Sequence, residues 1–129
     1  MRRQVAALLT AMVLVALVAV RHAQAQAETY VKGGSAIYSG VDVNIADGAH
    51  LARLHIAFEA QCMDEAAARL AVGPEAREAV VLLLRDKTYA ELSTPQGKRA
   101  LRQEILAALN KVLGAPRVVR VYFLQFVIG

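Results

Sequence analysis

The residues of this sequence best suited to chemistry are its three histidines and its single cysteine. His22, His50 and His55 have no cysteine or histidine partner at the spacing of a metal site. His55 falls on the polar side of an alternating segment, which is typical of a surface histidine. Cys62 falls on the apolar side of the same segment, where a free thiol behaves as a small hydrophobic residue. These four residues predict neither a metal centre nor a nucleophile.

The acidic pairs and the basic residues have structural explanations as well. Asp64 with Glu65, and Glu75 with Glu78, stand where helices are expected to begin, and carboxylates stabilise that end of a helix. No serine stands in a Gly-x-Ser-x-Gly turn. We therefore expect a non-enzymatic protein without a cofactor or a metal. The basic residues opposite the apolar stripe of the last expected helix, which predict a solvated face, are Lys98, Arg99 and Arg102.

The excess of positive charge lies at the start of the chain. Of the 15 Lys and Arg residues, three are Arg2, Arg3 and Arg21, whereas all 11 acidic residues lie from Glu28 onward. The part beyond residue 21 therefore has 12 basic and 11 acidic residues, a net charge of +1. This balance, without a basic patch that contains aromatic residues, argues against a nucleic-acid partner.

Residues 1–27 contain an uncharged, mostly apolar run at 5–20. As a signal peptide, this leader has a basic start and Ala-x-Ala sites that end at Ala25 and Ala27. As a membrane anchor, residues 4–20 approach the lower limit of about 17 residues that span a bilayer as a helix. Both interpretations export the rest of the chain. The apolar positions assigned to the membrane segment are Val5, Leu8, Leu9, Val13, Leu14, Leu17 and Val20.

The exported part predicts one small α+β domain, with an antiparallel sheet and helices packed on one of its faces. Glycine and serine residues without a sustained period predict a linker over 28–40, so the domain is expected over 41–129. Two alternating segments separated by Asp47-Gly48 predict a hairpin. The expected elements, in order, are strands at 41–46 and 53–61, helices at 63–71, 75–87 and 95–113, and a strand at 118–128.

The helix over 95–113 has the clearest start and stop. Ser93 with Gln96 fits a capping box, Pro95 lies in the first turn, and Gly114 ends the helix. The last strand has β-branched and aromatic residues on both faces, which predicts a central strand of the sheet. The apolar stripe of the helix, which is expected to be buried, consists of Leu101, Ile105, Ala108, Leu109 and Val112.

An ordered set of motifs runs through residues 82–114. They are Leu82–Leu84, Lys87-Thr88-Tyr89, Glu91-Leu92, Ser93-Thr94-Pro95, Gly97-Lys98, Leu101-Arg102, Glu104-Ile105 and Leu109-Asn110. Val43-Asn44-Ile45 precedes this block, and Val121-Tyr122-Phe123 with Phe126-Val127-Ile128 follows it. Together these motifs resemble the FliL family of flagellar basal-body-associated proteins, and the resemblance covers about residues 41–129.

The resemblance implies a cytoplasmic N-terminus and a single helix that anchors a periplasmic domain, similar to the stomatin/prohibitin-like fold, in the bacterial inner membrane. It further implies association with the MotA/MotB stator at the basal body, a ring-like homo-oligomer, and a role in flagellar rotation, swimming, swarming and chemotaxis. The alternative is a cleaved, secreted ligand-binding or inhibitor-like domain. The family-motif and core positions are Leu83, Leu84, Lys87, Thr88, Tyr89, Leu92, Pro95, Gly97, Leu101, Ile105, Leu109, Phe123 and Phe126.

Overall fold

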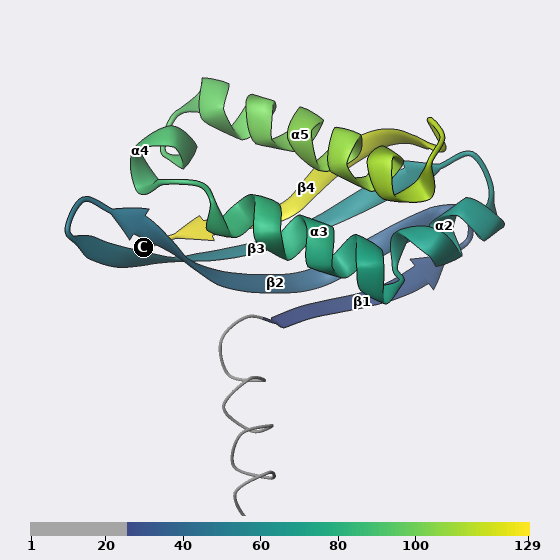
Figure 1. Cartoon of the computed structure of the whole chain (residues 1–129), viewed down its shortest axis with the longest axis horizontal. Coiled ribbons are helices and arrows are strands. Elements are labelled where there is room, and N and C mark those ends of the chain that lie inside the picture. The colour runs from purple at the N-terminus through teal and green to yellow at the C-terminus, as the bar shows by residue number, and fades with distance from the viewer. Residues whose placement is uncertain (1–25) are drawn as a thin grey trace, which may run out of the picture.

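The computed structural model describes residues 26–129, which form a four-stranded antiparallel sheet with helices on one face (Figure 1). The predicted α+β class and one-sided arrangement are confirmed. The predicted membrane segment at 5–20 lies outside the described residues. From residue 26 onward, no helix has the length and hydropathy that crossing a membrane requires. The strands follow one another across the sheet in chain order: β1 (Gln26–Lys32), β2 (Ser35–Asp47), β3 (His50–Cys62) and β4 (Val118–Ile128).

The first hairpin occupies the segment that was predicted to be a linker. β1 pairs antiparallel with β2, and the two residues Gly33-Gly34 form the turn between them. Gly33 has a φ of 60°, a conformation that glycine adopts at little cost. Ala27 and Val31 of β1 pack against the core. The linker prediction for 28–40 is therefore wrong, because its glycines form a tight turn between paired strands.

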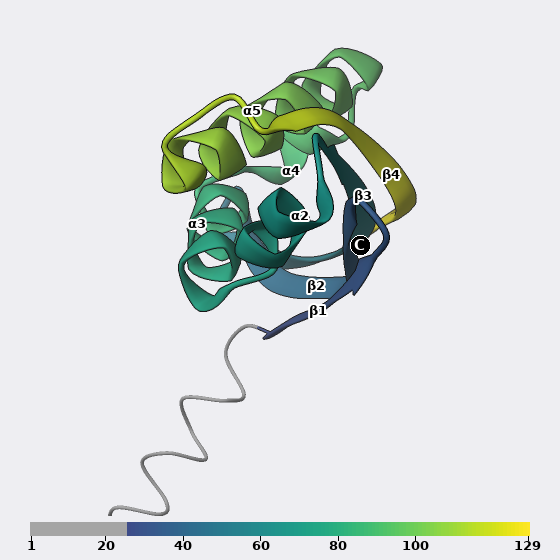
Figure 2. The ribbon, with the colours of Figure 1, turned by 90° about the vertical axis from the view of Figure 1, so that its right-hand side faces the viewer.

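The second hairpin confirms the prediction made from the alternating segments and the Asp47-Gly48 turn. β2 and β3 have 13 residues each, and Asp47 stands opposite His50 at the end of the ladder. Seen along its strands, the sheet curves around the helices (Figure 2). The buried residues that the two strands direct toward the helices include Val41, Val43, Ile45, Leu54, Ile56 and Phe58.

Four helices lie between β3 and β4 in the described chain: α2 (Glu65–Ala71), α3 (Pro74–Arg85), α4 (Tyr89–Leu92) and α5 (Pro95–Leu113). Three of them confirm predicted helices, while the single turn of α4 falls where none was predicted. Asp64 is the N-cap of α2, and its carboxylate accepts a hydrogen bond from the Ala67 N–H at 2.8 Å. Pro95 in the first turn of α5 and Gly114 after its last turn, with a φ of 71°, confirm the predicted start and stop.

The cap of α5 differs from the predicted one by a single residue. Thr94 is the N-cap, and its hydroxyl oxygen accepts a hydrogen bond from the Gly97 N–H at 3.0 Å. The prediction of Ser93 with Gln96 as the capping box is wrong. Ser93 instead ends α4, because its N–H donates to the Tyr89 carbonyl at 2.9 Å.

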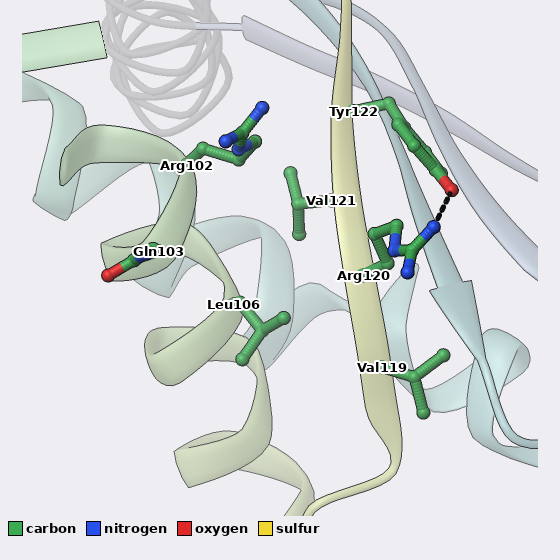
Figure 3. A pocket seen from close by; sticks show the side chains of 7 residues that line it. All are labelled: Arg102, Gln103, Leu106, Val119, Arg120, Val121 and Tyr122. Atoms are coloured by element: carbon green, nitrogen blue, oxygen red, sulfur yellow. Dashed lines mark hydrogen bonds between the residues drawn. The ribbon is translucent and has the colours of Figure 1, made fainter. Parts of the chain in front are cut away.

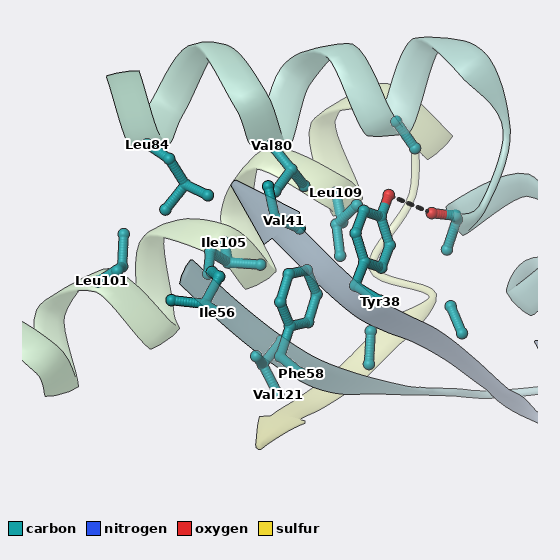
Figure 4. Close-up of a cluster of buried hydrophobic side chains, with 14 of the residues drawn as sticks. Tyr38, Val41, Ile56, Phe58, Val80, Leu84, Leu101, Ile105, Leu109 and Val121 are labelled. Carbon is teal, nitrogen blue, oxygen red and sulfur yellow. Dashed lines mark hydrogen bonds between the residues drawn. The ribbon is translucent and has the colours of Figure 1, made fainter. Parts of the chain in front are cut away.

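The core lies between the helices and the inner face of the sheet (Figure 4). Tyr38 stacks on Phe58 with ring centroids 4.4 Å apart, and its hydroxyl donates to the Ala71 carbonyl at 2.7 Å. Burial of each large aliphatic side chain stabilises the fold by about 2 kcal/mol. The fully buried residues of the two longest helices are Ala76, Val80 and Leu84 of α3, and Leu101, Ile105 and Leu109 of α5.

β4 is an edge strand, which corrects the prediction of a central one. It pairs with β3 on one side, and no other strand of residues 26–129 pairs with its second side. Its inner face contributes Val118 and Val121 to the core, but Val119, Leu124 and Val127 are each more than half exposed. The pattern is misleading because apolar residues on both faces of a strand usually indicate burial on both faces.

Candidate functional site

The described residues do not gather the side chains of a metal site. Within 26–129, no group of three or more His, Cys, Asp or Glu residues could hold a metal ion. Cys62 is buried at the end of β3, and this burial raises the pKa of its thiol above the ordinary value of 9.0. A thiol held in the protonated form is a poor nucleophile. Cys62 is thus a core residue, as the sequence predicts.

His55 lies on the outer face of the sheet, where the sequence predicts it. Its Nδ1 is 2.8 Å from Oδ1 of Asp42, and its Nε2 is 3.1 Å from Oε1 of Gln125. Gly40 accommodates the ring, since a Cβ at that position would lie 3.3 Å from the imidazole Cε1. The side chains of three neighbouring strands therefore meet at His55, which has the geometry of a structural polar contact across the sheet.

Several family-motif positions meet at one corner, where α3 ends, α4 makes one turn and α5 begins. Leu84 and Leu92 are buried inside this corner. The ammonium group of Lys87 forms an ion pair with Glu104 of α5 and lies 3.9 Å from the carboxylate of Glu91 in α4. The Lys87 side chain is only 15% exposed, so one lysine in the loop after α3 links both of the helices that follow.

Two threonines start the helices of this corner. Thr88 is the N-cap of α4, and its hydroxyl oxygen accepts a hydrogen bond from the Glu91 N–H at 3.2 Å. Thr94 has the same role in α5. The two helices touch at Gly97, where a Cβ would lie 1.6 Å from the Glu91 carbonyl oxygen. Tyr89, the first residue of α4, is partly exposed. These motifs therefore build a tight corner from caps and a close backbone approach.

Phe123 and Phe126 connect the end of β4 to the start of α5. Their rings meet edge to face with centroids 5.3 Å apart, and the Lys98 ammonium lies 5.0 Å from the Phe126 centroid. The prediction that Lys98 belongs to a solvated face is therefore corrected, because the lysine makes a cation–π contact with the strand. Arg99 and Arg102 are exposed, as predicted.

A groove of about 280 Å³ lies between α5 and β4 (Figure 3). The Arg120 guanidinium donates a hydrogen bond to the Tyr122 hydroxyl at 3.0 Å. The sequence does not predict this groove, since it predicts β4 to be buried on both sides. The one available signal is Arg120, a charge within an apolar strand. The residues that line the groove include Arg102, Gln103 and Leu106 of α5, and Val119, Arg120 and Tyr122 of β4.

Comparison with known proteins decides the family. The sequence model of the flagellar basal body-associated protein FliL matches residues 39–128. The chain belongs to the FliL family. The flagellar protein FliL of Aquifex aeolicus (strain VF5) is 38% identical over 55 residues, which cover 43% of this chain and 34% of that protein. The alignment thus spans about a third of the length of this FliL relative. The resemblance carried by residues 82–114 is confirmed.

The FliL match begins within β2 and ends at the last residue of β4. It includes the β2–β3 hairpin, helices α2 to α5 and the edge strand, so it contains both the corner and the groove. β1 precedes the matched residues. The FliL family consists of flagellar accessory proteins and is not a known enzyme family, which agrees with motif residues that cap, pack and form ion pairs.

Proposed function

We propose that this FliL-family chain is a non-enzymatic periplasmic protein of the flagellar basal body. It associates with the MotA/MotB stator as a ring-like homo-oligomer and supports flagellar rotation, swimming, swarming and chemotaxis. The observation that carries the proposal is the extent of the family match. Residues 39–128 contain β3, β4, most of β2 and every described helix, so nearly the whole folded unit is shared with the family.

A retained membrane helix at residues 5–20 is part of this proposal. Arg2 and Arg3 precede the apolar run, and basic residues favour the cytoplasmic side, which assigns the domain to the periplasm. β1 begins at Gln26, so residues 21–25 alone separate it from the run. Five residues reach at most about 18 Å. The anchor therefore holds the domain close to the inner membrane, in which the stator is embedded.

A cleaved, secreted domain that binds a ligand or acts as an inhibitor is the second candidate, and the two Ala-x-Ala sites favour it. Cleavage after Ala25 would leave β1 complete. Cleavage after Ala27 would remove two residues of β1, including an alanine that packs against the core. A processed form is therefore expected to begin at Gln26.

The intact mass of the exported protein separates the two candidates. We expect the full mass, in the membrane fraction, because the proposed helix is retained. A soluble periplasmic species that begins at Gln26 would overturn the anchored form and support the secreted one.

An in-frame deletion tests the role in motility. We expect slower swimming and impaired swarming with a normal number of filaments, and recovery when the full chain is supplied. Recovery should fail when the leader is exchanged for a cleaved signal peptide, because the domain is then no longer held at the membrane. Normal swimming and swarming of the deletion strain would contradict the stator role.

A further inference from the structure

The outer edge of β4 differs from the edge of β1 at the other side of the sheet. β4 has 11 residues, whereas β1 has 7 and carries Glu28 and Lys32. Apolar side chains on β4 are well exposed, with Val119 at 54% and Leu124 at 60%. Short strands and charges usually protect an edge, because free N–H and C=O groups pair readily with another strand. β4 has one charge, Arg120, and its pairing with β3 is irregular at Val119 and Leu124. The four residues 120–123 between these irregularities are paired in regular register, so this part of the edge is suited to accept a further strand.

Two arginines border the groove beside this edge, Arg102 from α5 and Arg120 from β4 (Figure 3). Among residues 26–129, no carboxylate forms an ion pair with either guanidinium. Glu59 stands opposite Tyr122 in the β3–β4 register, yet the Arg120 guanidinium bonds the tyrosine hydroxyl. The groove therefore offers two cations to a carboxylate from outside the described chain.

We propose that the β4 edge binds an extended, acidic segment of another protein, which adds to the sheet as a fifth strand. The backbone of this segment pairs with β4, and its carboxylates reach Arg102 and Arg120. Its apolar side chains cover Val119 and Leu106. In complexes of this kind, main-chain hydrogen bonds supply affinity and side-chain contacts supply the preference for a sequence.

A second copy of the chain fits this edge less well. β4 contains no acidic residue, so the edge of a second β4 would supply no carboxylate to Arg102 and Arg120. The β1 edge is bordered by Arg77 and Arg85 of α3, together with Glu78. Neither edge of the described chain offers the acidic strand that the groove favours, so the partner is a different polypeptide.

This inference goes beyond the proposed function, since binding at β4 requires neither an anchor, a ring nor contact with the stator. Normal motility of the deletion strain would overturn the proposed function and leave the binding measurement intact. Absence of peptide binding would overturn the present inference alone.

The experiment uses the full chain in detergent micelles and labelled peptides of about ten residues, enough to cover one strand. One peptide alternates valine and glutamate, a second alternates valine and lysine, and a third carries two prolines in the middle of the first. Fluorescence anisotropy measures Kd, and amide hydrogen exchange locates the contact. We expect saturable binding of the valine–glutamate peptide only, weakened by salt, with slower exchange at residues 119–124.

Paired variants distinguish the groove from other basic surfaces. Arg102→Gln with Arg120→Gln should raise Kd for the valine–glutamate peptide at least about tenfold, since truncating one partner of a charge pair at an interface weakens binding. The matched control, Arg53→Gln with Arg85→Gln, removes the same charge from exposed positions outside the groove and should leave Kd unchanged. Equal thermal unfolding of both double variants establishes that each is folded.

Three results would overturn the proposal. They are no saturable binding of the valine–glutamate peptide below about 1 mM, equal binding of the valine–lysine peptide, and an unchanged Kd in the groove variant. A photo-reactive phenylalanine derivative in place of Leu124 gives a further check in living cells. A cross-link to an acidic segment of another protein is expected, whereas a cross-link to a second copy of this chain would refute the choice of occupant.

Discussion

Replacing Gly97 by alanine tests how closely α4 and α5 approach. In an ordinary helix interior, alanine stabilises a protein relative to glycine by about 1 kcal/mol. Here a Cβ would lie 1.6 Å from the Glu91 carbonyl oxygen and 2.7 Å from its carbon. Ordinary contact begins near 3.4 Å, so α4 or the start of α5 must move by about 1.8 Å. The substitution should therefore destabilise the fold, opposite to the usual effect.

The displacement weakens three features of the corner. The cap bond from the Gly97 N–H to Thr94 is lost or stretched, which costs about 1 kcal/mol. Leu92, at 1% exposed, moves with α4, and its partial exposure costs about 1–2 kcal/mol. The contact of Lys87 with Glu91 also lengthens. After the gain in helix propensity, we expect Gly97→Ala to lower the free energy of unfolding by about 2 kcal/mol.

Urea unfolding of the purified protein, followed by far-UV circular dichroism, measures this change. The matched control is Gln96→Ala, an exposed position in the same turn, which should change stability by less than about 0.5 kcal/mol. A Gly97→Ala variant as stable as the native protein, or more stable, would refute the close approach of the two helices.

Three further predictions concern the core, the corner and alkaline pH. Leu109→Ala should lower the free energy of unfolding by about 3 kcal/mol in a urea titration, because Leu109 is fully buried; a small change would place this face of α5 outside the core. Lys87→Met and Glu104→Gln should each lower the free energy of unfolding by about 1 kcal/mol, and the double variant should lower it by less than the sum of the two. Additive effects would exclude a stabilising ion pair between these residues. Burial raises the pKa of the Cys62 thiol above 9.0, so its contribution to stability is complete below pH 9.0 and is lost as pH rises through the raised pKa. Cys62→Ala should make the thermal midpoint fall less steeply as pH rises above 9.0, and an unchanged pH dependence would contradict the burial of this thiol. Burial also raises the pKa of the Tyr38 phenol, so Tyr38→Phe measures the separate contribution of that group to the same pH dependence.

Local signals were sufficient to predict the limits of α5 and the second hairpin. Pro95 and Gly114 each determine the end of the helix at which they stand, and Asp47-Gly48 forms the hairpin turn from two adjacent residues. The same kind of signal was wrong at residues 28–40. Two glycines suit a linker and a hairpin turn equally well, and the pairing of β1 with β2 decides between them.

The corner and the groove, too, could be predicted from the sequence only in part. Lys87 and Gly97 could be assigned to a family motif from the sequence, but their roles depend on partners in other elements. Glu104 lies 17 positions after Lys87, and the Glu91 carbonyl reaches Gly97 because α4 turns back onto α5. The edge position of β4, which exposes Arg120, could not be derived from a strand with apolar residues on both faces.

The amino-acid sequence alone is enough to assign the FliL family, the α+β class and the limits of α5, because motifs, periodicity and the residues that start and stop a helix act over a few consecutive residues. The tertiary structure decides that residues 28–40 belong to a paired hairpin, that Gly97 lies against the backbone of α4, and that β4 has an open basic edge. Each of these features depends on contacts between residues of different elements, and such contacts exist only once the chain has folded.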